Sequence, residues 1–373
     1  MEFNIPLSKP DITEKEIQSV VGVLKTPHLS LGKKYIEFQE KVASYVGVKY
    51  AVAVNSGTSA LHLIIKALGI GKGDEVITTP FSFIASSNCI LYEQATPVFV
   101  DIDENTLNID VTKIEEKITK KTKAILAVDV FSHPADWDAL QEIAKKHNLF
   151  LIEDSAEAFG SMYKGKQCGS FGEAGVFAFY PNKQMTTGEG GMVLTNNKEL
   201  ADACTSMANQ GRKVEDGKWL EHVRLGYNYR LDEMSAALGV AQMGRIEEML
   251  KKRANVANLY NEKLKGIEEV ETRFVAEGSQ LSWFVYVVKL SEKFAGKKRD
   301  DIIKKMGEQG IKCSNYFQPI HLQPFYKNEF GYKEGDFPVT EDVSQRTLAL
   351  PFFNDLTEEQ INTVVQTLKN ELI

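Results

Sequence analysis

Short apolar runs alternate with segments of helical periodicity over the first half of the chain. Between the runs, segments such as "SALHLIIKALGI" and "DWDALQEIAKKH" carry apolar residues at helical spacing. This alternation predicts an α/β fold with a mostly parallel sheet, helices on both of its faces, and ligands at the carboxyl ends of the strands. The runs expected to form strands are Ala51–Val54, Glu75–Thr78, Pro97–Ile102, Ala124–Val130, Phe150–Ile152 and Val176–Tyr180.

The second half follows a different pattern. From about Asp232 the sequence predicts one long helical stretch, with apolar residues at helical spacing as far as Leu264. Beyond it, "SWFVYVVKL" (Ser282–Leu290) predicts a strand, and "KRDDIIKKMGEQG" predicts a helix that ends at Gly310. Since no Pro/Ser-rich linker is present, we expect two closely packed domains: a large domain of residues 1–245 and a smaller C-terminal α/β domain of residues 246–373.

Composition and charge narrow the classes of partner. The chain has 373 residues, of which 43% are hydrophobic and 25% charged, enough for one large or two medium domains with full cores. Its net charge is −7 and it has no block of basic residues, which argues against binding to nucleic acid or to an anionic membrane. Small metabolites are the expected partners.

The cysteines and the N-terminal segment indicate the cellular compartment in which the protein is expected. Cys89, Cys168, Cys204 and Cys313 form no CxxC pair, which argues against a disulfide framework or a zinc site, and no metal is predicted. The opening residues lack the basic-then-apolar plan of a signal peptide, and no apolar run approaches the roughly 18 residues of a membrane span. A cytoplasmic protein with reduced thiols is expected.

Three places in the first half carry candidate chemistry, and the first follows the strand expected at residues 51–54. There Gly57, Thr58 and Ser59 open a helix. Free backbone N–H groups at a helix start form a site for an anion such as phosphate, and glycine lets the anion approach closely. An ordinary Ser/Thr helix cap would have the same sequence.

The second place is Asp154, which follows the apolar run of "LFLIEDSAEAFGS". A carboxylate just beyond a buried strand lies in the ligand crevice of a parallel sheet, where it can pair with a protonated ring nitrogen or a metal. Asp154 could equally cap the turn that follows.

The third place is Lys183, which lies in "FAFYPNKQMTTGEGGM" between an apolar run and a glycine-rich turn. A single lysine is usually a solvated charge. Beyond a strand, next to Pro181, it would be held on irregular backbone, where a partly desolvated amine is a better nucleophile.

The three places have one joint explanation. Pyridoxal phosphate needs an anchor for its phosphate, a carboxylate that keeps its pyridine nitrogen protonated, and a lysine that forms a Schiff base with it. The sequence supplies the three in that order and predicts this cofactor.

Four ordered motifs carry a family resemblance. "NSGTSALHL", "IEDSAEAFGS", "FYPNKQMTTGEGGM" and "LGYNYRLDEMSAALGVAQM" together resemble the DegT-like family of nucleotide-sugar aminotransferases, over roughly Pro10 to the C-terminus. The resemblance implies the type I fold of pyridoxal-phosphate-dependent transferases.

The resemblance also implies roles for the three candidate places. Gly57, Thr58 and Ser59 match the family's phosphate-binding turn, and Phe83 in "PFSFIAS" lies where an aromatic ring stacks on the cofactor. Asp154 matches the carboxylate paired with the pyridine nitrogen.

Further positions match in the same way. Lys183 matches the Schiff-base lysine, and Glu157 lies where relatives have Gln or Glu near the cofactor's phenolic oxygen. Asn228 in "GYNYR" matches a residue that reaches the phosphate of the neighbouring subunit's cofactor, which implies a homodimer with shared active sites. Tyr316 and His321 fall in a stretch that usually faces the sugar nucleotide.

Two positions depart from the family pattern. Ala178, five residues before the lysine, replaces a serine that binds the phosphate in many relatives, so one hydroxyl contact is missing or comes from elsewhere. His133 in "FSHPADWD" stands where a glycine-containing loop is common; it could face the site, but we expect a solvated loop histidine.

The resemblance implies the reaction. Relatives that remove a sugar hydroxyl have histidine at the Schiff-base position, whereas this chain has Lys183 and is expected to be a transaminase. The amino donor is expected to be glutamate, with Lys183 moving a proton between the donor carbon and the cofactor. The acceptor is expected to be a keto group of a nucleotide-linked deoxysugar, and "TTGEGGM" resembles relatives that aminate a 4-keto sugar.

Two alternatives come from other classes. A nicotinamide-dependent oxidoreductase would need GxGxxG directly after a strand, whereas "GIGKGD" (Gly69–Asp74) follows a helix and precedes a strand. A sensor or binding module on the same fold would have a broken Lys183 and Asp154 pair, which this sequence keeps intact.

Overall fold

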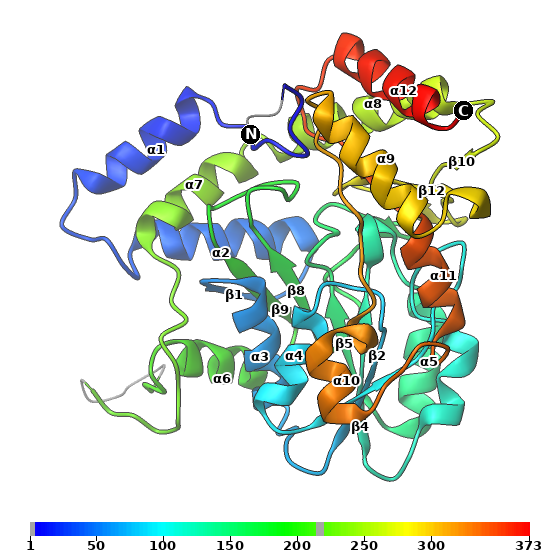
Figure 1. Ribbon diagram of the computed structural model, residues 1–373. Helices are drawn as coiled ribbons and strands as arrows, with labels where there is room; N and C mark the ends of the chain where they lie inside the picture. Colours follow the sequence, from blue (N-terminus) through cyan, green and yellow to red (C-terminus); the bar gives the residue numbers. More distant parts are fainter. Residues whose placement is uncertain (1–3, 214–219) are drawn as a thin grey trace.

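The computed structural model describes residues 4–213 and 220–373, and its largest element is a seven-stranded sheet (Figure 1). The strand order is β1-β9-β8-β5-β4-β2-β3, in which β9 runs antiparallel to both neighbours and the run from β8 to β3 is parallel. The strands are β1 Tyr50–Val54, β2 Glu75–Thr78, β3 Thr96–Phe99, β4 Thr122–Val128, β5 Phe150–Asp154, β8 Ala174–Ala178 and β9 Gly191–Thr195.

Helices cover both faces of this sheet, because alternate side chains of each strand point to opposite sides. One face packs on α3, α4 and α6, and the other on α2, α5 and α7. The helices of this half are α1 Glu14–Leu24, α2 Lys33–Val46, α3 Gly57–Ala67, α4 Ala85–Tyr92, α5 Trp137–His147, α6 Lys198–Ala208 and α7 Glu233–Met243. The predicted α/β class with a mostly parallel sheet is confirmed.

A second core surrounds a small antiparallel sheet of β10 (Val270–Glu271), β12 (Tyr286–Leu290) and β13 (Thr347–Leu350). The remaining short strands, β6 (Met162–Tyr163), β7 (Lys166–Gln167) and β11 (Ser279–Gln280), form a third sheet that joins the two halves of the chain. The helices of the second half are α8 Ile246–Leu264, α9 Lys297–Glu308, α10 Pro324–Phe330, α11 Pro338–Arg346 and α12 Glu358–Glu371.

The limits of the two domains stay a prediction. The second core lends support to a unit of residues 246–373, although it also contains Ile5. In the other direction, Ile320 and Tyr326 of the second half pack on Phe99 of β3.

Every apolar run predicted as a strand overlaps one, but the runs missed β9. All five residues of β9 are buried, yet only Met192, Val193 and Leu194 are large and apolar, and they directly follow the glycine-rich turn. Because this short apolar stretch follows the glycine-rich turn, it was not recognised as a strand. In the structure it pairs between β1 and β8.

The predicted single helix from Asp232 to Leu264 is wrong, because the chain breaks between α7 and α8. Arg245 has a non-helical backbone at φ −125° and ψ 8°. Its buried guanidinium donates to Asp11 at 2.9 Å and to Glu16 at 3.0 Å. At the break, the Arg245 guanidinium thus pairs with two buried carboxylates, which would be costly to leave without a partner.

The predicted end of the 297–308 helix at Gly310 is confirmed, with φ at +79° directly after the C-cap. The strand predicted at Ser282–Leu290 is shorter, because residues 282–285 lead into β12 without joining it. In the described ranges, no helix has both the length and the hydropathy that a bilayer crossing requires.

Candidate active site

Asp154 is the last residue of β5 and lies at the carboxyl end of the sheet. Its side chain is buried, and it accepts hydrogen bonds from the Ser86 hydroxyl at 2.7 Å and from the Ala156 backbone N–H at 3.1 Å. Burial raises the pKa of Asp154, while these donors and Lys183 act in the opposite direction. A cationic partner would therefore favour the ionised carboxylate strongly.

Lys183 lies in the turn that follows β8, and its side chain is only 13% exposed. Its Nζ lies 3.7 Å from Glu157 Oε1 and 3.8 Å from the centre of the Phe284 ring. Burial lowers the pKa of Lys183, against the opposing effect of Glu157 and Asp154. A lysine in this environment loses its proton more readily and becomes a better nucleophile.

Glu157 joins this group from the turn after β5. Its Oε2 accepts a hydrogen bond from the Phe131 backbone N–H at 2.9 Å, while its Oε1 faces Lys183. Burial raises the pKa of Glu157, and Lys183 counteracts this shift. The structure therefore brings Asp154, Glu157 and Lys183 together, although Lys183 comes from a different segment of the chain than the two carboxyl groups.

The expected phosphate turn forms the start of α3. The Ser56 side chain caps the helix by accepting the Ser59 N–H at 3.1 Å, and Ser59 Oγ donates to Asn55 at 2.7 Å. Within the described residues, no hydrogen bond from the N–H of Gly57 or Thr58 is seen, as expected for the first turn of a helix. These two donors fit a phosphate group.

The turn lies against the strand that leads to Lys183. A Cβ atom on Gly57 would come within 2.8 Å of the Ala178 Cβ, so a side chain there would force the strand and the turn apart. The position that departs from the family pattern is thus in direct contact with the phosphate turn. A larger residue at 178 would crowd Gly57.

Phe83 and Asn228 present exposed side chains near the same edge. Phe83 is 61% exposed and lies between β2 and α4, next to Ser82, whose hydroxyl contacts that of Ser86. Asn228 is exposed, and its backbone carbonyl accepts a bond of 3.4 Å from Asn55, the residue two before Gly57. Both side chains are free to contact a group outside their own chain.

The two expected substrate residues differ in their placement. Tyr316 is partly buried; its ring stacks on Phe131, and Glu157 contributes to raising the pKa of Tyr316, after burial. His321 is fully buried, with Nε2 at 3.0 Å from Glu341 Oε1. Tyr316 therefore borders the lysine site, whereas His321 lies inside the packing around Phe337. Their substrate roles stay predictions.

The expectation of a solvated His133 is wrong, because the ring is 1% exposed. Its Nε2 accepts the Ala276 N–H at 3.1 Å, and its Nδ1 lies 2.8 Å from the Pro134 carbonyl. Burial lowers the pKa of His133 to about 4, so the ring is neutral and joins two segments of the chain.

Sequence reasoning missed three residues of the site. Ser86 donates to Asp154, Phe284 lies under Lys183, and Gln184 donates to the Ser282 hydroxyl at 2.7 Å. Ser86 follows the predicted cofactor residue Phe83 by three positions, which was a usable signal. Nothing in the sequence pointed to Phe284, because it comes from the distant second half.

Comparisons with known proteins agree with this geometry. The model of the DegT/DnrJ/EryC1/StrS aminotransferase family matches residues 10–369. GDP-perosamine synthase of Escherichia coli O157:H7 is 38% identical over 365 residues, which cover 98% of this chain and 97% of that protein.

Solved structures give the same result. PseC of Helicobacter pylori, an aminotransferase involved in the biosynthesis of pseudoaminic acid, is 30% identical with a TM-score of 0.92, and the match covers 100% of this chain and 99% of PseC. The PLP form of Spr1654 from Streptococcus pneumoniae is 29% identical with a TM-score of 0.94, and it covers 99% and 98% of the two chains.

Two findings lead to one conclusion. The family match covers nearly the whole chain, and a lysine, a carboxylate and a helix start fit pyridoxal phosphate. The chain belongs to the DegT/DnrJ/EryC1/StrS aminotransferase family, as a sugar aminotransferase that depends on pyridoxal phosphate.

Proposed function

We propose that this enzyme transfers the amino group of glutamate to the 4-keto group of a nucleotide-linked deoxysugar, in the cytoplasm, as a step of aminosugar and polysaccharide biosynthesis. The observation that carries the transfer reaction is the buried group of Lys183, Glu157 and Asp154 beside the phosphate turn. The similarity to a GDP-perosamine synthase supports a nucleotide sugar as acceptor. The "TTGEGGM" turn supports the 4-keto position.

Each residue has a distinct task in this proposal. Gly57, Thr58 and Ser59 bind the phosphate, Phe83 stacks on the ring, and Asp154 holds a proton on the ring nitrogen. When bound, pyridoxal phosphate supplies a ring that accepts the electron pair left on the substrate carbon.

Lys183 has two tasks, which depend on its low exposure. It attaches the cofactor covalently, and once released its neutral amine moves a proton to or from the substrate carbon. Glu157 holds the amine in position from 3.7 Å, near the place where the cofactor's phenolic oxygen is expected. Tyr316 and His321 are proposed to contact the sugar nucleotide.

We further propose a homodimer in which Asn228 reaches the phosphate bound by the partner subunit. The exposed side chain of Asn228 supports this assignment. The alternative is that Asn228 serves the phosphate turn of its own chain, beside Asn55.

The substrate can be tested with glutamate and a panel of nucleotide-linked 3-keto and 4-keto sugars. Formation of 2-oxoglutarate with a 4-keto sugar alone is expected, and the position of the new amine is then read from the product by NMR. Turnover restricted to 3-keto sugars would refute the assigned position. Turnover with another amino acid but not with glutamate would refute the donor.

The covalent link can be tested by reduction. Borohydride is expected to fix pyridoxal phosphate to the peptide that contains Lys183, because reduction makes the link permanent. Lys183→Ala should lose turnover and still bind some cofactor through the phosphate turn and Asp154. Peptide mapping by mass spectrometry checks the site, and a label on a different lysine would overturn the assignment.

The role of Asp154 can be tested with Asp154→Asn. This variant is expected to keep its fold and much of its cofactor but to lose activity on the order of 100-fold or more, because an amide does not hold a proton on the ring nitrogen. Ser86→Ala, which removes one hydrogen bond to Asp154, should cost only about tenfold. Near-normal kcat in Asp154→Asn would contradict the role.

The shared site can be tested by mixing two inactive variants, Lys183→Ala and Asn228→Trp, under conditions of subunit exchange. In a mixed dimer one site carries both defects and the other carries neither, so activity should return in up to half of the sites. Each variant incubated alone is the control. If exchange is demonstrated and no activity returns, Asn228 serves its own chain, or the loop that carries it is only structural.

A further inference from the structure

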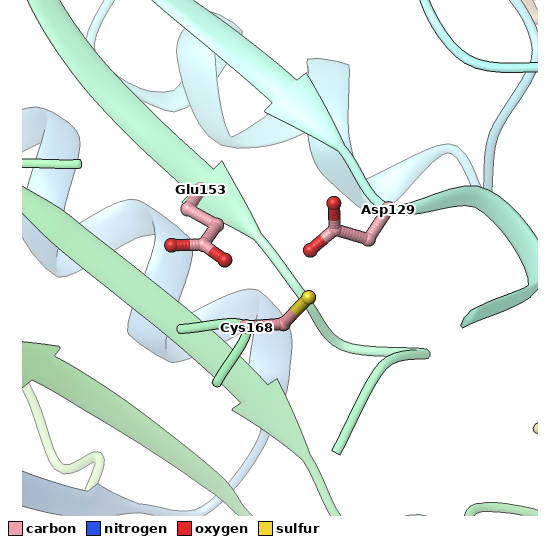
Figure 2. A group of neighbouring side chains, drawn as sticks. All are labelled: Asp129, Glu153 and Cys168. Carbon is pink, nitrogen blue, oxygen red and sulfur yellow. The ribbon is translucent and has the colours of Figure 1, made fainter. Parts of the chain in front are cut away.

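Two carboxyl groups and a thiol meet on the side of the sheet opposite Asp154. Figure 2 shows Glu153 on β5, Asp129 directly after β4, and Cys168, with their side chains pointing toward one another. One ligand atom from each lies within 4.8 Å of the others. Glu153 and Asp154 are neighbours in a strand, so their side chains take opposite faces.

The group is a hydrogen-bonded unit and not a vacant set of metal ligands. Asp129 Oδ1 accepts the Ala135 N–H at 2.8 Å and the Trp137 indole N–H at 3.1 Å. Glu153 Oε1 accepts the Gly169 N–H, and its Oε2 accepts the Phe171 N–H at 2.8 Å. Three of the four carboxyl oxygens are thus engaged by N–H donors.

The fourth oxygen, Asp129 Oδ2, lies next to a hydroxyl group that also contacts Glu153, so the protons available for these two contacts have to be counted. Ser155 Oγ lies 2.6 Å from Asp129 Oδ2 and 2.9 Å from Glu153 Oε1. A hydroxyl has one proton and can donate to only one of these oxygens. The other close contact is a hydrogen bond only if a carboxyl group supplies a proton to Ser155.

The hydrogen bonds favour Asp129 as the carboxyl group that carries this proton. Both oxygens of Glu153 accept a backbone N–H, whereas Asp129 Oδ2 accepts none from the described residues. A proton on Asp129 Oδ2 can be donated to Ser155, which in turn donates to Glu153. This arrangement satisfies all three groups.

We propose that Asp129 is a neutral carboxylic acid that shares its proton with Glu153 through Ser155, and that it is a positioning residue for Asp154. The pair then carries one negative charge beneath the site. The Asp129 backbone N–H donates to the Asp154 carbonyl at 3.1 Å, so the neutral acid and the cofactor-side carboxylate belong to one rigid strand end.

The charge balance of the site explains the need for a neutral acid. Lys183 is one cation facing two buried carboxyls, Asp154 and Glu157. A second negative charge on the Asp129–Glu153 pair would disfavour the ionised form of Asp154, because like charges repel. Burial raises the pKa of both Asp129 and Glu153, so that the pair keeps one proton at neutral pH, and burial also raises the pKa of the Cys168 thiol, which adds no charge.

The proposal rests on the role of Asp154 in the proposed function, and it is tested with Asp129→Asn, Glu153→Gln and Asp129→Ala. The amide of Asp129→Asn can donate to Ser155 and accept both N–H groups, so this holoenzyme should keep its melting temperature at pH 7, and its activity to within about twofold. In Glu153→Gln, the side-chain amide N–H would face the backbone N–H of Gly169 or Phe171, both of which need an acceptor. This variant should therefore be strongly destabilised. Asp129→Ala should be destabilised too.

Two readouts distinguish a neutral acid from a merely structural carboxylate. The infrared C=O band of a protonated carboxyl at pH 7 should lose intensity in Asp129→Asn, with Asp136→Asn, an exposed helix cap, as control. The wild type should also lose stability relative to Asp129→Asn as pH rises from about 4 to about 8, by on the order of 2 °C per pH unit, because the folded protein binds the extra proton.

The outcomes against the proposal are distinct. An unchanged infrared band, a stable Glu153→Gln with an unfolded Asp129→Asn, or a melting-temperature difference independent of pH would each overturn it. Failure of the proposed function appears differently, as an inactive wild type or a fully active Asp154→Asn, and leaves these stability and infrared results unaffected.

Discussion

The burial of one lysine amine among carboxyl groups is the constraint on which the site depends. An isolated charge transferred from water into the protein interior is costly, so Lys183 needs partners that are themselves fixed. Glu157 lies 3.7 Å away, and the face of the Phe284 ring lies 3.8 Å away, within the range of a cation–π contact. Asp154 is the second carboxyl group that favours the charged form of Lys183. The end of β5 and the turn after β8 therefore have to lie close together.

The small second core contributes directly to this arrangement. Arg253 on α8 is buried and donates to the carbonyl of Trp283 at 2.7 Å and to that of Phe284 at 2.8 Å. The Phe284 N–H in turn donates to Ser132 Oγ at 2.7 Å. Trp283 and Ser132 both have positive φ angles, which non-glycine residues adopt only when their surroundings hold them there. The ring under Lys183 is therefore held from both halves of the chain.

Features determined locally could be predicted from the sequence, and features determined by distant contacts could not. Asp154 and Lys183 could be found because Asp154 ends one buried strand and Lys183 lies in the turn after another, and the sheet brings strand ends together. The break at Arg245 could not be found, since the residues that Arg245 pairs with there, Asp11 and Glu16, lie far away in the sequence. His133 was mistaken for a solvated residue for the same reason, because its partner at Ala276 belongs to the second half.

Helix α3 connects the phosphate turn with the loop that carries Asn228. Its first turn forms the proposed phosphate site, and its next turn bears His62, whose ring nitrogens contact the Tyr229 hydroxyl at 3.0 Å and Glu93 at 2.8 Å. Tyr227 stacks on Tyr229 with ring centres 4.8 Å apart and donates to the same Glu93. The two tyrosines on either side of Asn228 are thus fixed to α3 and α4, while the asparagine between them stays exposed. Because one helix orients both the phosphate turn and this loop, a shift of α3 would move the two together.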